Sequence, residues 1–163
     1  MITQSDQNDA KEILSLQKLA YQSEAKLYDD YSIPPLTQTL DDIKAQFHTH
    51  VFLKAVNNST IIGSVRAYEK DRTCIIGRLI VHPDFQKKGI GKHLMKEIEN
   101  CFITSERYEL FTGTKSKKNI LFYQNLGYHI HKYEKLSDVL EFVYLEKIQS
   151  SGPGHDPTDT IDH

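Results

Sequence analysis

The sequence predicts one α/β domain in which helices cover both faces of a mixed, mostly antiparallel sheet. A length of 163 residues is typical of a single domain. Helical and strand-like apolar spacings alternate along the chain. A strand, a helix and a second strand follow one another over residues 73–113, which is long enough for a right-handed parallel crossover. Strand pairs with short turns precede and follow this unit, and these pairs are expected to be antiparallel.

Two helices are expected before the first strand. Residues 9–21 and 39–47 both have the apolar spacing of amphipathic helices, and Asp9 and Thr39 can cap their N-termini. Residues 22–38 are mixed in pattern and are interrupted by a Pro-Pro pair. The chain therefore begins with an α-α unit.

Three strands follow. Residues 51–56 and 60–70 flank a short polar turn and predict a hairpin. The third strand, 73–82, is an almost continuous apolar run, which favours a central position covered on both faces. Pro83 ends it.

The remaining elements complete the order α-α-β-β-β-α-β-α-β-β. Asn119 can cap the last helix and Gly127 can stop it. The expected segments are helix 90–102, strand 108–113, helix 119–126 and strands 128–135 and 139–148. Residues 1–148 are thus expected to form the domain, and 149–163 a disordered tail.

Composition narrows the function classes. The chain is 39% hydrophobic and 26% charged, with a mean hydropathy of -0.50. It has no apolar run of the roughly 18 residues that a membrane helix needs, and its start is too polar for a signal peptide. Cys74 and Cys101 do not make a disulfide framework. A cytoplasmic protein with reduced thiols and no membrane partner is expected.

The net charge of -2 is unevenly distributed, with acidic ends and a basic centre. A basic centre suits an anionic ligand, although solvated faces of helices and hairpins explain the charge equally well. No tight Lys/Arg cluster is interleaved with aromatic residues, so nucleic acid is not an expected partner.

The loop that joins the third strand to the next helix carries a candidate phosphate site. The first turn of a helix leaves backbone N–H groups free for an anion. Gly89 and Gly91 have no Cβ and permit a close approach, and Lys87, Lys88 and Lys92 add positive charge. The spacing is not that of a P-loop, and Leu94 occupies the third glycine position of a dinucleotide-binding loop.

Two longer motifs give this loop its context. Residues 81–91 read V-H-P-D-F-Q-K-K-G-I-G, and residues 119–128 read N-I-L-F-Y-Q-N-L-G-Y. In this order, about one strand apart, they resemble motifs A and B of the GNAT family of acetyl-CoA-dependent N-acetyltransferases. The resemblance implies a GNAT-like fold whose sheet is splayed at the middle.

The resemblance also implies residue roles. The freed backbone of residues 79–81 would bind the pantetheine arm, and the amide of Val81 would polarise the thioester carbonyl. Tyr123 would be catalytic, protonating the departing CoA thiolate; without the motif, Tyr123 reads as a core tyrosine. The implied cofactor-binding residues are Leu79, Ile80, Val81, Gln86, Lys87, Lys88, Gly89, Ile90, Gly91, Lys92, Asn119 and Tyr123.

The expected function is transfer of the acetyl group of acetyl-CoA to a primary amine, on a small molecule or a protein, by direct attack in a ternary complex. Many relatives place a glutamate where this chain has Gly77, so the general base is open between Glu69 and a water relay. Arg78 could meet an acceptor carboxylate or pair with a glutamate. A non-catalytic acyl-CoA sensor is the alternative, and a site for another phosphate ligand such as a dinucleotide is a third.

Several features stay undecided by the sequence. The acceptor is not identified, and a homodimer paired through the last two strands is open. His48/His50 and His129/His131 lack a third ligand, so no metal site is expected. Tyr21, Tyr28 and Tyr31, with Glu24, Asp29 and Asp30, fall where relatives form an acceptor pocket; a packed helix with a wet outer face explains them as well.

Overall fold

The computed structural model describes residues 1–149. Apart from residue 149, the expected disordered tail lies outside the described residues. The elements are β1 (Ile2–Gln4), η1 (Gln7–Asp9), α1 (Ala10–Ala20), α2 (Gln22–Tyr28), α3 (Pro34–Thr37), α4 (Leu40–Gln46), β2 (Val51–Asn57), β3 (Thr60–Lys70), β4 (Thr73–Val81), η2 (Pro83–Phe85), α5 (Ile90–Cys101), β5 (Arg107–Gly113), α6 (Lys117–Asn125), β6 (His129–Lys135) and β7 (Glu141–Ile148).

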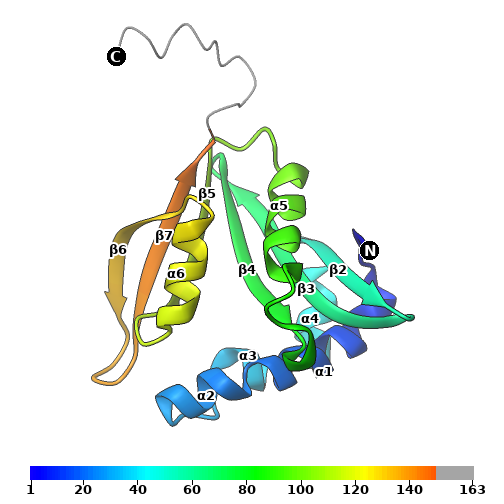
Figure 1. Ribbon diagram of the computed structural model, residues 1–163, viewed down its shortest axis with the longest axis horizontal. Helices are drawn as coiled ribbons and strands as arrows, with labels where there is room; N and C mark the ends of the chain where they lie inside the picture. Colours follow the sequence, from blue (N-terminus) through cyan, green and yellow to red (C-terminus); the bar gives the residue numbers. More distant parts are fainter. Residues whose placement is uncertain (150–163) are drawn as a thin grey trace, which may run out of the picture.

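The strands form a seven-stranded sheet in the order β1-β2-β3-β4-β5-β7-β6 (Figure 1). Only β4 and β5 pair in parallel, and all other neighbours are antiparallel. The predicted mixed, mostly antiparallel sheet is therefore confirmed. The sequence analysis missed β1, which is too short to show an alternating pattern. The expected α-α start is also incomplete, because the short helices α2 and α3 lie between the two predicted helices.

Local chemistry explains where the helices begin. Thr39 caps α4 in a capping box with Asp42, as expected. The Pro-Pro pair begins α3 rather than interrupting a helix, because proline fits the first positions of a helix. The expected start of α6 at Asn119 is wrong: Ser116 is the N-cap residue, and the Asn119 side chain reaches Glu24 and Thr112 instead.

Two apolar cores lie on the two faces of the sheet. Alternation along β2 separates them, since Leu53 joins one cluster and Phe52 the other. The first cluster includes Leu94 of α5 and Phe122 of α6. The second includes Ile13 of α1 and residues of α4. Helices therefore cover both faces, as expected.

The sheet opens between its two central strands. β4 pairs with β5 only over Thr73–Ile75, opposite Arg107–Glu109. Figure 1 shows the two strands close together at one end and apart at the other, where α2 and α3 cross the opening. The register of β4 against β3 shifts at Arg78 and Leu79, and Arg78 has a φ of 50°. This β-bulge bends β4, and the bend accounts for the parting of the strands.

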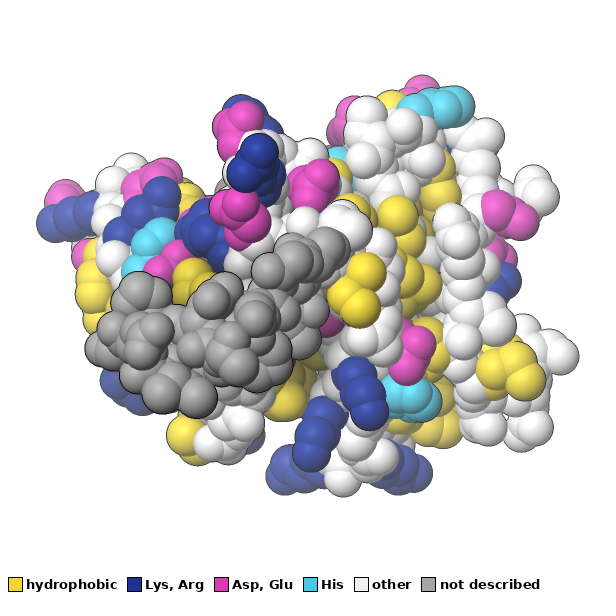
Figure 2. Space-filling view, turned by 90° about the horizontal axis from the view of Figure 1, so that it is seen from above, with side chains coloured by type: hydrophobic (Ala, Val, Ile, Leu, Met, Phe, Trp, Pro, Cys, Tyr) yellow, Lys and Arg dark blue, Asp and Glu magenta, His cyan; other side chains and the backbone are white. Residues whose placement is uncertain are grey.

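Charge on the molecular surface is mixed. On the face seen in Figure 2, Lys and Arg side chains lie in separate groups among Asp and Glu. No helix within residues 1–149 is long and apolar enough to cross a membrane.

Candidate active site at the opening of the sheet

The open end of β4 directs backbone polar groups into the gap. The N–H of His82 donates to the carbonyl of Ile62 at 2.7 Å, and Gly63 lies opposite Val81. In an antiparallel ladder, bonded and non-bonded pairs alternate, so the N–H and C=O of Val81 point away from β3 and toward β5. Gln86 Nε2 donates to the Val81 carbonyl at 3.2 Å, leaving the N–H in the gap.

The glycine loop sits next to this strand end. It turns into α5 at Gly89, whose φ of 83° is in the left-handed region that favours glycine. The first helical bond runs from the His93 N–H to the Gly89 carbonyl, so the N–H groups of Ile90, Gly91 and Lys92 have no carbonyl to bond within the helix. A Cβ at Gly89 would meet nothing within 4 Å. The loop can therefore accept an anion at the helix N-terminus.

Gly91 has a different role from Gly89. A Cβ at Gly91 would lie 3.4 Å from Phe122 Cζ and 3.8 Å from Val81 Cγ2. These are ordinary van der Waals distances, so the Phe122 ring of α6 lies close to the start of α5 but would accommodate a methyl group there. The two motifs that stand apart in the sequence are thus in contact at this point.

Tyr123 lies in α6 on the same side of the sheet. Its ring packs edge-on against Phe122 and Tyr128, with centroids 5.2 and 6.1 Å away. Burial raises the pKa of the Tyr123 phenol, and the nearby Tyr21 and Glu24 raise it further. A phenol with a raised pKa keeps its proton at neutral pH, so Tyr123 can donate that proton or a hydrogen bond.

α2 is tied to the start of α6 by Glu24. Its carboxylate accepts from Ser116 Oγ at 2.5 Å and from Asn119 Nδ2 at 3.4 Å. Asn119 Nδ2 also lies 3.4 Å from Thr112 Oγ1 of β5. Asn119 is therefore placed at the gap by α2 and β5, rather than by a helix cap.

The three N-terminal tyrosines have separate environments. Tyr28 is buried, and its hydroxyl accepts the Lys115 N–H at 2.9 Å. Tyr31 is 58% exposed. Tyr21 packs beneath Arg78, 6.0 Å from ring centroid to guanidinium carbon. Burial raises the pKa of Tyr21, and the charges of Arg78 and Arg66 partly oppose this. Of these three tyrosines, only Tyr21 both contacts Arg78 and affects the pKa of Tyr123.

The sequence singled out Arg78 but missed Arg66, a second arginine beside the site. Arg66 of β3 is 3% exposed and bonds to three glutamine side chains. Arg78 lines a hollow of about 430 Å³ beneath α3 and α4. The available signal was a charged residue within the long apolar run of β3, which implies a buried arginine with dedicated partners.

No carboxylate of β3 or β4 occupies the base position at the open end. Glu69 lies opposite Cys74 at the paired end of β4 and accepts from Ser105 Oγ at 2.6 Å. It is at the wrong end of β4 to meet an acceptor near Val81, because β4 spans 73–81. A Cβ at Gly77 would meet nothing within 4 Å. Of the two bases left open by the sequence, the water relay is the one compatible with this geometry.

The histidine pairs have local partners. His50 bonds to Thr49 Oγ1 at 2.7 Å, and His131 Nε2 lies 2.9 Å from Glu109. Within residues 1–149, no group of three or more His, Cys, Asp or Glu side chains could hold a metal ion.

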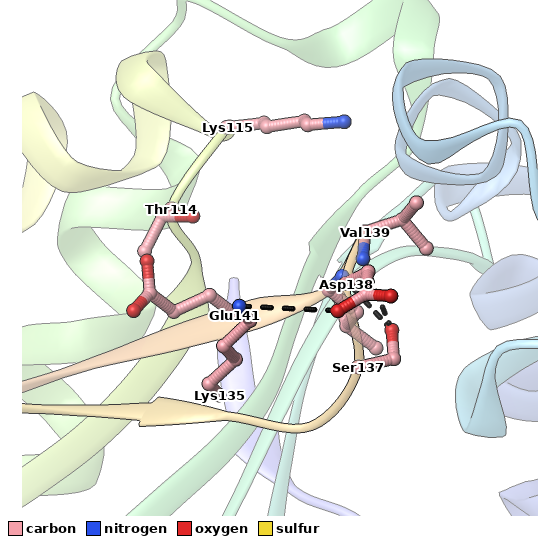
Figure 3. Close-up of a pocket in the computed structure, with 8 residues that line it drawn as sticks. Thr114, Lys115, Lys135, Ser137, Asp138, Val139 and Glu141 are labelled. Carbon is pink, nitrogen blue, oxygen red and sulfur yellow. Dashed lines mark hydrogen bonds and ion pairs between the residues drawn. The ribbon is translucent and has the colours of Figure 1, made fainter.

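A second hollow, of about 270 Å³, has none of the predicted cofactor-binding residues in its lining (Figure 3). Lys115, before α6, and Ser137, Asp138 and Val139, in the β6–β7 turn, are among its lining.

Comparison with protein families identifies the chain. The acetyltransferase (GNAT) domain model matches residues 48–130, which contain the splayed strand, the glycine loop and Tyr123. The chain belongs to the GNAT acetyltransferase family. The resemblance expected from the two motifs is confirmed.

The chain is also similar in sequence to a curated protein and in fold to solved acetyltransferases. The chain is 32% identical over 120 residues to the UPF0157 protein YqkA of Bacillus subtilis; the match covers 73% of this chain but 34% of that protein's length. PaiA N-acetyltransferase of Thermoplasma acidophilum, solved in complex with coenzyme A, has a TM-score of 0.76 at 17% identity, covering 91% of this chain and 98% of that one. The putative acetyltransferase YncA of Salmonella typhimurium, solved with acetyl-CoA, has a TM-score of 0.74 at 15% identity, covering 96% and 98%. These structures share the fold of this GNAT chain.

Proposed function

We propose that this protein is an N-acetyltransferase that uses acetyl-CoA to acetylate a primary amine by direct attack in a ternary complex. The observation that carries the proposal is the Val81 N–H, aimed into the opening of the sheet one short loop before the N-terminus of α5. Membership of the GNAT family and structural neighbours solved with coenzyme A or acetyl-CoA support the choice of donor.

The residues present fit the donor. Gly89 leaves open space above the loop, and the first amides of α5 point at it, which suits a pyrophosphate. Lys87 and Lys88 are exposed beside it. The gap after Ile75 leaves one side of β4 free for the pantetheine arm.

Two groups of this chain act in the proposed reaction, and water carries the remaining protons. The Val81 N–H donates a hydrogen bond to the thioester carbonyl oxygen, where negative charge develops. The amine nitrogen then bonds to the carbonyl carbon as the carbon–sulfur bond breaks. Tyr123 gives its proton to the thiolate sulfur and regains one from water, while water takes the proton that the nitrogen loses.

A sensor that binds acyl-CoA without turnover is the second candidate. It is favoured by Gly77, which leaves the open strand without a carboxylate. The two candidates share the CoA site and differ only in whether thiol is released.

Two measurements test the proposal. Calorimetry with CoA should show binding, and acetyl-CoA with an amine library should release free thiol. Binding without thiol release from any amine would establish the sensor, and absence of CoA binding would reject both candidates.

A variant pair localises the site. Gly89→Trp should abolish CoA binding, because the indole occupies the space above the amides. Gly127→Trp is the control, since Gly127 also has a positive φ, 96°, but follows α6. Should Gly89→Trp fail to fold, the exposed pair Lys87→Glu and Lys88→Glu should weaken CoA binding by about tenfold or more. Unchanged affinity in that double variant would place the pyrophosphate elsewhere.

A further inference from the structure

Arg66 is a buried cation held by neutral groups. Its guanidinium donates to Gln46 Oε1 at 2.5 Å, to Gln17 Oε1, and to Gln38 Oε1 at 3.5 Å. It also lies 4.7 Å above the ring of Phe52. These partners fix its position, but none of them carries a charge that neutralises it.

Arg78 is turned toward the same place by the β-bulge. Cys74 and Ile76 belong to the core under α5, and plain alternation would put residue 78 on that face as well. Instead, the bulge places Arg78 over Tyr21 and in the wall of the hollow under α3 and α4. Its Nε is buried and has no hydrogen-bond partner, the one such side-chain atom within residues 1–149.

The two cations repel each other and lack an acid. Neither forms an ion pair within the described part of the chain. Burial lowers the pKa of Arg66 to about 9, and the charge of Arg78 contributes to this. Arg107 shows the contrast: Glu109 and Glu146 flank it, and together they outweigh burial and raise its pKa. An anion between Arg66 and Arg78 would offset a charge that the protein itself leaves unbalanced.

The hollow beside Arg78 can receive that anion. Its volume is about 430 Å³, and Gln38 and Gln46, the two amides that also hold Arg66, line it. Asp42 is on its rim, where its carboxylate accepts the Thr39 N–H at 3.2 Å in the cap of α4. The fixed cations and neutral amides favour a planar anion such as a carboxylate, which guanidinium groups bind with two parallel hydrogen bonds.

The hollow also lies within reach of the proposed reaction centre. Arg78 precedes Val81 by three residues, roughly 10 Å along an extended strand. Tyr21 contacts Arg78 and influences the phenol of Tyr123. We infer that the acceptor is an amino acid or a similar amine that carries a carboxylate, with the carboxylate held by Arg78 over the buried charge of Arg66 and the amine directed toward Val81. This inference rests on the proposed function and names its acceptor class.

Matched ligand pairs test the inference by binding. Lysine and cadaverine, ornithine and putrescine, and phenylalanine and phenethylamine each differ by a carboxylate. Their affinities are measured by calorimetry with the protein saturated with CoA, so that no turnover is needed. At least one amino acid should bind about 10- to 100-fold more tightly than its partner, the effect of one hydrogen-bonded charge pair.

Arg78→Gln should remove this preference and leave CoA affinity unchanged, whereas Arg78→Lys should retain part of it. Arg72→Gln is the control, since Arg72 is exposed on the β3–β4 turn and pairs with Glu106. Melting temperatures confirm that each variant is folded.

Equal affinities within every pair, or a preference that survives Arg78→Gln, would overturn the inference. These outcomes are independent of the proposed function, which thiol release measures. If the protein acetylates amines equally well with and without a carboxylate, the proposed function stands and the inferred acceptor class is rejected.

Discussion

Tyr123 holds the proton that the proposed reaction delivers to sulfur. Its raised pKa follows first from burial, and both Tyr21 and Glu24 oppose formation of a further negative charge. The raised pKa makes the phenol a weak acid and keeps it protonated until a thiolate forms beside it. At that moment the proton moves from the phenol to the sulfur, and the negative charge passes to the phenol oxygen until a proton from water neutralises it.

Tyr123→Phe should lower kcat about 100-fold, because it removes the donor and keeps the ring. The affinity for CoA should change by less than about threefold, since the ring contacts with Phe122 and Tyr128 remain. Steady-state kinetics of thiol release, with calorimetry for CoA, measure both values. Tyr31→Phe, at an exposed position of the same residue type, is the control. A normal kcat in Tyr123→Phe would assign protonation of the thiolate to water.

Gly77 of β4 and Gly113 of β5 differ in the space that each has for a side chain. Gly77 of β4 has empty space where a Cβ would lie, and its φ is not in the left-handed region. At Gly113 of β5, a Cβ would overlap the phenol of Tyr28. The absence of a side chain at Gly113 thus lets α2 seat Tyr28 against the strand and hold the Lys115 N–H.

At the scale of elements, α2 is fastened to the β5–α6 segment at two points, Tyr28 against Gly113 and Glu24 against Ser116 and Asn119. This contact spans most of the sequence, and no local pattern encodes it. The longer helices and strands follow from spacing and caps and lie near their expected bounds, whereas α2 itself was not predicted. What sequence reasoning could not supply is which side chain of α2 meets which strand, because that depends on tertiary packing.

Gly113→Ala should lower the free energy of unfolding by about 1–3 kcal/mol, since the methyl group forces Tyr28 out of its place. Gly77→Ala is the matched control and should raise stability by about 0.5–1 kcal/mol by restricting the unfolded chain. Urea denaturation provides both values.

A double-variant cycle identifies the cause. In a Tyr28→Ala background, Gly113→Ala should have little effect, because the overlapping ring is gone. A loss of the same size in that background would show that backbone strain, and not the α2 contact, makes alanine unfavourable at Gly113.

On the scale of the whole molecule, the sheet consists of two halves joined along β4 and β5 by a three-residue ladder. The sequence predicted the order of elements from β2 to β7 and the β-α-β crossover, because both depend on local periodicity, but it did not predict β1, α2 or α3. The motifs predicted the opening and the glycine loop through family resemblance. The sequence singled out Arg78 and left its partner open, but it did not predict that a bulge turns Arg78 to the opposite face or that a long-range network holds Arg66. Neither property is visible in a linear pattern.

CoA should stabilise this divided sheet by joining its halves. Ligand at about 100 times its dissociation constant adds about 2.7 kcal/mol to the free energy of unfolding, and for a chain of this size each kcal/mol raises Tm by about 2–4 °C. Differential scanning calorimetry should therefore show a rise in Tm of roughly 5–11 °C.

Hydrogen exchange should locate the bound CoA. Exchange should slow most at Val81, at the first turn of α5 and in the part of β5 beyond Glu109, where β4 and β5 do not pair with each other. The internal control is the paired end of β4, Thr73–Ile75. Its exchange should slow only as much as the increase in the free energy of global unfolding requires. Uniform protection along β4, with no excess at the open end, would mean that CoA binds outside the gap and that the parting of the strands serves another purpose.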